Sequence, residues 1–179
     1  MTNNTLFCGL ALAVIGVYSY YADTPDWIKK ANDIIETQNA DATKAYEEAK
    51  KTDPSTPAPT AKSPKQASMT ALIPAALGVL LLVVVAVVIF KPGTRKHAMH
   101  LAAVIGVVGL LGGLYALSGG PKEITELGLP MDFKTMWDQP KIRSGALTAL
   151  VSGIYVGLAV KSFIDARKAQ AAAGGQPQA

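Results

Sequence analysis

The sequence predicts an all-α integral membrane protein with four transmembrane helices and one amphipathic helix outside the membrane. Half of its 179 residues are apolar and only 17% are charged, whereas soluble domains carry about 25% charged residues. The charge is also unevenly spread, because residues 69–90 contain no ionisable side chain and three further segments are predominantly apolar. Long apolar segments separated by charged ones are typical of a chain that crosses a bilayer several times.

The four apolar segments have the lengths that transmembrane helices need. Residues 69–90 would form a helix about 33 Å long, which is enough for a hydrocarbon core of about 30 Å. The other three segments are residues 6–22, 98–117 and 144–160. The last two are rich in glycine, which is commoner in membrane helices than in soluble ones.

Residues 1–22 are interpreted as an uncleaved N-terminal transmembrane anchor, with a signal peptide as the alternative. The first residues, MTNNT, contain no Lys or Arg. A cut after Ala22 would place Tyr20 where signal peptidase requires a small side chain. Both features favour the anchor.

Residues 23–52 are predicted to form an amphipathic helix outside the membrane. Thr24 is expected to be its N-cap, with Pro25 in the first turn. Apolar residues then recur at spacings of three, four and seven, which places them on one face; they are Trp27, Ala31, Ile34, Ile35, Ala42, Ala45, Tyr46 and Ala49. This face could lie against the membrane or the protein's own loops, or it could dock a partner.

A proline-rich segment divides the chain. Residues 53–68 contain four prolines among Ser, Thr and Ala, which predicts an extended linker. Residues 69–168 then form a three-span membrane unit with a loop at 118–143. Residues 169–179 are expected to be a disordered tail.

The distribution of Lys and Arg predicts how the chain is threaded. Positive residues beside membrane spans are retained in the cytoplasm; those after the second and fourth spans are Lys91, Arg95, Lys96, Lys161, Arg167 and Lys168. Residues 23–67 and 118–143 carry no positive excess. We therefore expect both termini in the cytoplasm and these two segments on the other side of the membrane.

The outer loop is too apolar to be freely solvated. Its large apolar side chains are Ile124, Leu127, Leu129, Met131, Phe133, Met136 and Trp137. We expect the loop to lie along the outer membrane–water interface, with contact to a partner protein as the alternative.

The stretch RKHAMH, residues 95–100, raises the question of a metal or haem site. His97 and His100 share a helix face, but two ligands do not complete a zinc site, and both would approach a haem from the same turn. Cys8 adds only one thiol. We therefore expect no metal or cofactor, and interpret the stretch as a basic turn that binds lipid headgroups, with a metal shared between subunits as the alternative.

Other function classes receive little support. No ionisable residue lies in the middle of a span, which disfavours an ion-coupled transporter. Ser152 and Thr148 are expected to bond to helix backbone. Asp132 and Asp138 lie beside Lys134 and Lys141, so solvated ion pairs explain them better than catalysis. No glycine-rich phosphate loop and no nucleic-acid motif is present, so we expect neither an enzyme nor a nucleic-acid partner, and the sequence identifies no small-molecule substrate.

Small residues on the last two spans predict close helix packing. Gly145, Ala149, Gly153 and Gly157 recur every fourth residue, and we expect another helix to cross at Gly153. The third span carries a matching set, Ala98, Ala102, Gly106, Gly109 and Gly113. Such residues let helix backbones approach, either within one subunit or in a homo-oligomer or larger complex.

Three stretches resemble a group of small bacterial inner-membrane proteins with no assigned activity. These are MTALIPA at residue 69, RKHAMHLAA at residue 95 and KSFIDARK at residue 161, so the resemblance covers residues 69–168. It implies an inner-membrane location and an added N-terminal arm over residues 1–68. We expect a structural, accessory or scaffolding subunit of a membrane assembly, with a small oligomeric transporter or channel as the alternative.

Overall fold

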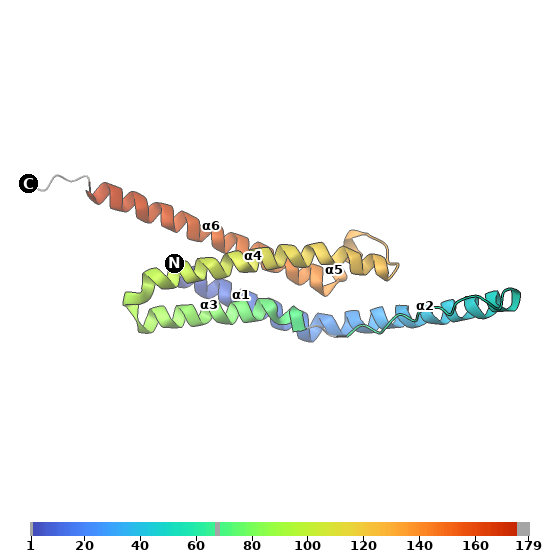
Figure 1. Ribbon diagram of the computed structural model, residues 1–179. Coiled ribbons are helices and arrows are strands. Elements are labelled where there is room, and N and C mark those ends of the chain that lie inside the picture. The colour runs from blue at the N-terminus through green and yellow to red at the C-terminus, as the bar shows by residue number, and fades with distance from the viewer. Residues whose placement is uncertain (1, 67–68, 175–179) are drawn as a thin grey trace, which may run out of the picture.

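The computed structural model describes residues 2–66 and 69–174, and over these ranges it contains helices and no strand (Figure 1). Four helical stretches are long and apolar enough to cross a membrane: Asn3–Thr52, Met69–Phe90, His97–Glu126 and Pro140–Ala169. The predicted all-α class and the four potential membrane-spanning helices are therefore confirmed.

The first two predicted helices form one continuous helix of 50 residues. Helix α1, Thr2–Tyr18, passes through the π-helical turn η1, Ser19–Asp23, into α2, Thr24–Thr52. Thr24 is therefore not an N-cap; its backbone is helical and its hydroxyl donates to the Ser19 carbonyl at 2.6 Å. A π turn rearranges the local hydrogen bonds, and here it precedes Pro25, which has no backbone N–H to donate.

The remaining helices follow in order along the chain. The short turn η2, Met69–Leu72, leads into α3, Ile73–Phe90, and η3, Pro92–Thr94, leads into α4, Arg95–Glu126. Helix α5, Phe133–Asp138, is a single short segment before α6, Pro140–Gly174. Helix α6 thus includes residues 169–174 of the expected disordered tail. Residues 175–179 lie outside the described part of the chain.

Helices α4 and α6 are longer than the spans predicted for them. The 32 residues of α4 measure about 48 Å, well beyond a hydrocarbon core of about 30 Å. The α4 helix continues through Pro121, and its last turns belong to what the sequence predicted as a loop. The last turns of α4, helix α5 and the start of α6, residues 118–143, form a helical head. This head lies beyond one end of the bundle formed by α1, α3, α4 and α6.

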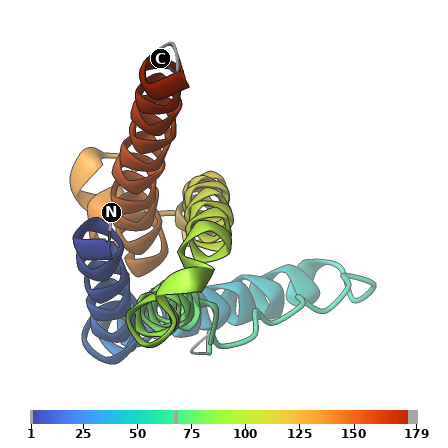
Figure 2. The same ribbon diagram turned by 90° about the vertical axis from the view of Figure 1, so that its left-hand side faces the viewer.

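The two ends of the molecule differ in what they contain. The N-terminus, the turn between α3 and α4 and the end of α6 lie at one end, whereas α2 and α5 lie at the other (Figure 1). Viewed from the first end, α1, α3, α4 and α6 surround a common axis, and α2 leans away from it (Figure 2).

Two separate hydrophobic clusters stabilise the structure. The bundle cluster takes residues from all four long helices: Cys8, Leu12, Leu81, Val84, Ala98, Ala102, Ile105 and Tyr155. The head cluster joins α2 to the ends of α4 and α6: Trp27, Ala31, Ile35, Ile124, Leu127 and Ile142. The first half of the apolar stripe of α2 is thus buried against Ile124, Leu127 and Ile142 of the same chain.

Helices α1 and α3 approach each other closely through glycine. A Cβ atom on Gly78 would lie 2.5 Å from both the Gly9 oxygen and the Ala13 nitrogen. These distances leave no space for a side chain, so the two backbones are in contact. This contact between the first two spans was not predicted from the sequence.

Candidate functional site

The predicted small-residue contact between α4 and α6 lies within the chain. A Cβ on Gly113 would lie 2.6 Å from the Ala149 nitrogen and 2.7 Å from the Gly145 oxygen. Further along α4, a Cβ on Gly109 would lie 2.5 Å from Ser152 Oγ, and a Cβ on Gly106 would lie 2.7 Å from the Tyr155 ring.

The stripe on α6 is corrected at its far end. Gly153 has only Leu110 near its Cβ position, at 3.7 Å, and Gly157 is exposed with nothing within 4 Å. Residues four apart advance about 40° beyond a full turn at each step, so the stripe rotates away from α4. The α6 positions that face the interior are spaced by three and four: Ile142, Gly145, Thr148, Ser152, Tyr155 and Ala159.

The basic turn is exposed at the bundle end that also carries the C-terminal basic residues. Lys91, Arg95, His97 and His100 are exposed, as are Arg167 and Lys168, and the side chain of Lys96 lies outside the described residues. The His100 ring lies 5.2 Å from the Phe163 ring on α6. Among the described residues no group of three or more His, Cys, Asp or Glu could hold a metal ion, and headgroup binding stays a prediction.

Glu123 links three helices within the head. Its two carboxylate oxygens accept hydrogen bonds from Trp27 Nε1 at 3.3 Å and from Gln139 Nε2 at 2.8 Å. The first donor comes from α2 and the second from the residue between α5 and α6. Gln38 of α2 adds a bond of 3.0 Å from its side-chain N–H to the Leu127 carbonyl.

The proline-rich segment runs back along α2. Asn32 and the backbone of Lys65 exchange two hydrogen bonds of 3.2 and 2.7 Å, and Asn39 and the backbone of Lys62 exchange two of 2.9 and 2.8 Å. Lys65 also forms an ion pair with Glu126 at 3.5 Å. Residues 53–66 contain no helix or strand, and asparagine side chains satisfy part of their backbone.

Asp132 begins the short helix α5. Its side chain accepts from the Thr135 backbone N–H at 2.7 Å, as an N-cap does. The backbone and side-chain hydrogen bonds from Thr135, with help from the charge of Lys134, lower the pKa of the Asp132 carboxyl. Nearby Met131, Phe133 and Trp137 are exposed, and the last two rings stack.

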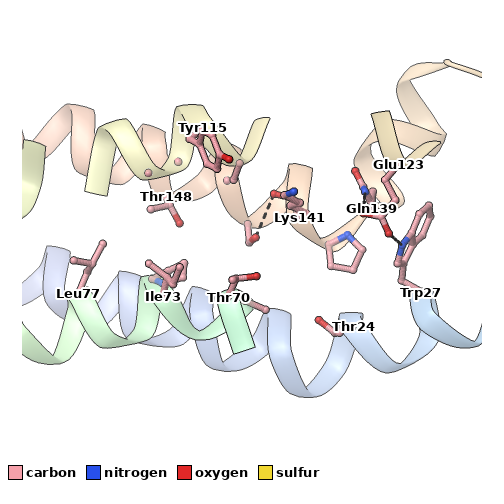
Figure 3. A pocket seen from close by; sticks show the side chains of 18 of the residues that line it. Thr24, Trp27, Thr70, Ile73, Leu77, Tyr115, Glu123, Gln139, Lys141 and Thr148 are labelled. Carbon is pink, nitrogen blue, oxygen red and sulfur yellow. Dashed lines mark hydrogen bonds between the residues drawn. The ribbon is translucent and has the colours of Figure 1, made fainter. Parts of the chain in front are cut away.

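A cavity of about 260 Å³ separates the bundle cluster from the head cluster. The start of α3 lies on one side, and the middle of α4 and the start of α6 lie on the other (Figure 3). Its polar lining side chains gather toward the head, near Trp27, Glu123 and Gln139, whereas the opposite end lies at Leu77 and Thr148 (Figure 3). The cavity is therefore amphipathic along its length.

Three buried polar atoms around this region have no hydrogen-bond partner: Gln139 Oε1, Thr148 Oγ1 and Ser152 Oγ. The prediction that Thr148 and Ser152 bond to helix backbone is thus wrong. Ser152 packs its hydroxyl against Gly109, and Gln139 Oε1 lies against Gly120. Thr148, only 3% exposed, points its hydroxyl into the cavity (Figure 3). Leaving such a group unsatisfied costs about 1–3 kcal/mol.

The roles of Glu123, Gln139 and Trp27 were not predicted, since single polar residues with partners far along the chain leave no local pattern. Comparison of the chain with protein-family models, with curated proteins and with solved structures found no match.

Proposed function

We propose that this protein is a multi-pass subunit of a bacterial inner-membrane assembly, with a structural, accessory or scaffolding role. In this arrangement the basic turn and both termini lie in the cytoplasm, and the head lies outside. The clustering of exposed cations at one end of the bundle supports this orientation.

The observation that carries the proposal is the second half of α2. Helix α2 has 29 residues, but its buried residues end at Ile35. Beyond the head its apolar stripe continues through Ala42, Ala45 and Ala49, all exposed. The extended segment does not cover these positions, because it bonds to Asn32 and Asn39, about 100° around the helix from the stripe.

An uncovered stripe of small residues on a projecting helix is suited to pack against another helix. Small side chains allow close approach, and the flanking charged residues, with Lys44 and Glu48 exposed on other faces, keep the helix solvated when it is alone. The surface thus fits a helical segment of another subunit of the same assembly.

A photo-crosslinking residue placed on two faces of α2 tests this proposal. At Ala45, on the stripe, it should crosslink in living cells to one protein that also copurifies stoichiometrically in mild detergent. At Lys44, about 135° away from the stripe centre, it should not. Crosslinking from Ala45 only to a second copy of the chain would favour a homo-oligomeric transporter or channel, and a monomer with no crosslink from either face would overturn the proposal.

A further inference from the structure

We propose that the cavity between the two hydrophobic clusters binds one phospholipid whose headgroup carries a primary ammonium. This inference rests on the proposed membrane location, because the mouth of the cavity lies in the apolar part of the chain. Three observations carry it: where the cavity opens, what lies at its polar end, and the unpartnered hydroxyl inside it.

The cavity opens between α3 and α4. These helices contact each other where Leu77 Cδ1 lies 3.6 Å from the Cβ position of Gly109. One turn further, Gly112 has no atom within 4 Å of its Cβ position, and it lines the cavity together with the exposed residues Ile73 and Tyr115. All these residues belong to helices long and apolar enough to cross a membrane, so an occupant would enter from the bilayer.

The polar end of the cavity offers a negative charge without a cation. Glu123 is half-buried, and both donors to its carboxylate are neutral, the Trp27 indole and the Gln139 amide. Glu126, on the next turn of α4, does have a cationic partner, because it forms an ion pair with Lys65. A carboxylate with free lone pairs in this position accepts hydrogen bonds from an ammonium group.

Two lysines that line the cavity complement the rest of a zwitterionic headgroup. Lys65 and Lys141 both line the cavity, and Lys65 pairs with Glu126, three residues beyond Glu123 on α4. A phosphate would be attracted to these cations while the ammonium bonds to Glu123. A glycerol headgroup would supply hydroxyl donors but no positive charge, and would bind more weakly.

Thr148 accounts for the other end of the ligand. Its hydroxyl is buried, has no partner and points into the cavity. It lies eight residues from Pro140, the first residue of α6 and the one that follows Gln139, which is about 12 Å along the helix axis. A hydroxyl at this depth can donate to an ester carbonyl of the lipid, and one acyl chain would then lie along Leu77 and leave through the mouth at Gly112.

Native mass spectrometry of the full chain, purified from membranes and exchanged into dioleoyl lipids, tests the assignment. The protein should retain one phosphatidylethanolamine in preference to phosphatidylglycerol, by about tenfold or more, since a charge-assisted hydrogen bond is lost with the latter. Equal retention of the two lipids would overturn the proposal. If the parent protein is not recovered in the membrane fraction, the proposed function itself fails.

Two glycines provide a matched pair of variants. Gly112 and Gly157 are both exposed helical glycines with nothing within 4 Å of their Cβ positions, but only Gly112 lines the cavity. Gly112→Phe should fill the mouth and abolish retention of phosphatidylethanolamine, whereas Gly157→Phe should retain it like the parent.

Glu123→Gln keeps the size of the side chain and removes its charge. It should reduce the preference for phosphatidylethanolamine over phosphatidylglycerol to less than about threefold, because the ammonium loses its charged acceptor. Unchanged retention in Gly112→Phe, or an unchanged preference in Glu123→Gln, would each overturn the proposal. Melting temperatures of all three variants establish that they are folded.

Discussion

Trp27 donates its indole N–H to the Glu123 carboxylate over 3.3 Å, across 96 positions of the sequence. The bond fastens the start of α2 to the end of α4, and the Trp27 side chain is only 7% exposed. The amphipathic helix is therefore docked on the last turns of α4 at a fixed point, and its second half projects beyond the head together with the proline-rich segment.

Removing Trp27 should release α2 from the head. Trp27→Ala should destabilise the protein by about 3–5 kcal/mol, as expected for a buried aromatic side chain, and Trp27→Phe by about 1 kcal/mol for the lost hydrogen bond. Thermal unfolding in detergent measures both. The control is Trp137→Ala, since this tryptophan is 39% exposed and its removal should cost about 0.5 kcal/mol or less. Equal effects of the two alanine variants would contradict the docking.

The cap on α5 should make this short helix sensitive to acid. The pKa of Asp132 is lowered in the folded protein by its bonds to Thr135. The unfolded chain therefore binds a proton first as pH falls, so the stabilisation is present above the ordinary aspartate pKa and is lost as pH falls through the lowered, folded value. The protection of the Thr135 amide from exchange, measured relative to its intrinsic exchange rate at each pH, should fall over that window.

Two variants separate the charge of Asp132 from its capping bond. Asp132→Asn keeps a capping oxygen and should remove the pH dependence of this protection at Thr135, while Asp132→Ala should leave the amide weakly protected at every pH. Asp138→Asn, in the same exposed segment, serves as the control and should leave the profile unchanged. A pH dependence that survives in Asp132→Asn would assign it to another group.

The orientation of the chain can be tested with a reporter enzyme that is active only outside the cytoplasm. Fusions near Pro59 or Asp132 should be active, and fusions at Thr94 or at the C-terminus should be inactive. The reason is that exposed Lys and Arg gather at the end of the bundle that contains the α3–α4 turn and the end of α6. Activity at Thr94 would reverse the proposed threading of every span.

The membrane-compatible helices were predictable because hydrocarbon thickness sets a length and composition that one segment shows by itself. The contact of α4 with α6 was predicted, but that of α1 with α3 was not, since small residues indicate close approach without naming the partner. Gly78 thus gave no sign that it meets Gly9 and Ala13. Thr24 and Pro25 are typical of the start of a helix, and here that interpretation was misleading. A π turn accommodates these residues inside a continuous helix.

The candidate cavity was equally hidden from the sequence. Thr148 was expected to bond to its own helix, which is the usual state of a threonine in a membrane helix. Its missing partner follows from the space between α3 and α4, and that space depends on how far two helices separate beyond Leu77. Such a distance is a property of the packed chain and leaves no pattern in the residues.

The contact between α4 and α6 should depend on Gly113 and not on Gly153. A Cβ on Gly113 would meet backbone atoms, the Ala149 nitrogen at 2.6 Å and the Gly145 oxygen at 2.7 Å. Backbone cannot rotate aside as a side chain can, so Gly113→Leu should separate the helices and lower stability by about 1–3 kcal/mol or more. Thermal unfolding in detergent is the measurement.

Gly153→Leu is the matched control for this substitution. Its Cβ would lie 3.7 Å from the end of the Leu110 side chain, an ordinary van der Waals distance, and the position is only partly buried. A leucine there adds apolar surface next to lipid, so stability should change by about 0.5 kcal/mol or less. A larger loss for Gly153→Leu than for Gly113→Leu would mean that α6 is rotated in the membrane so that its four-residue stripe, and not the 145–152–159 face, meets α4.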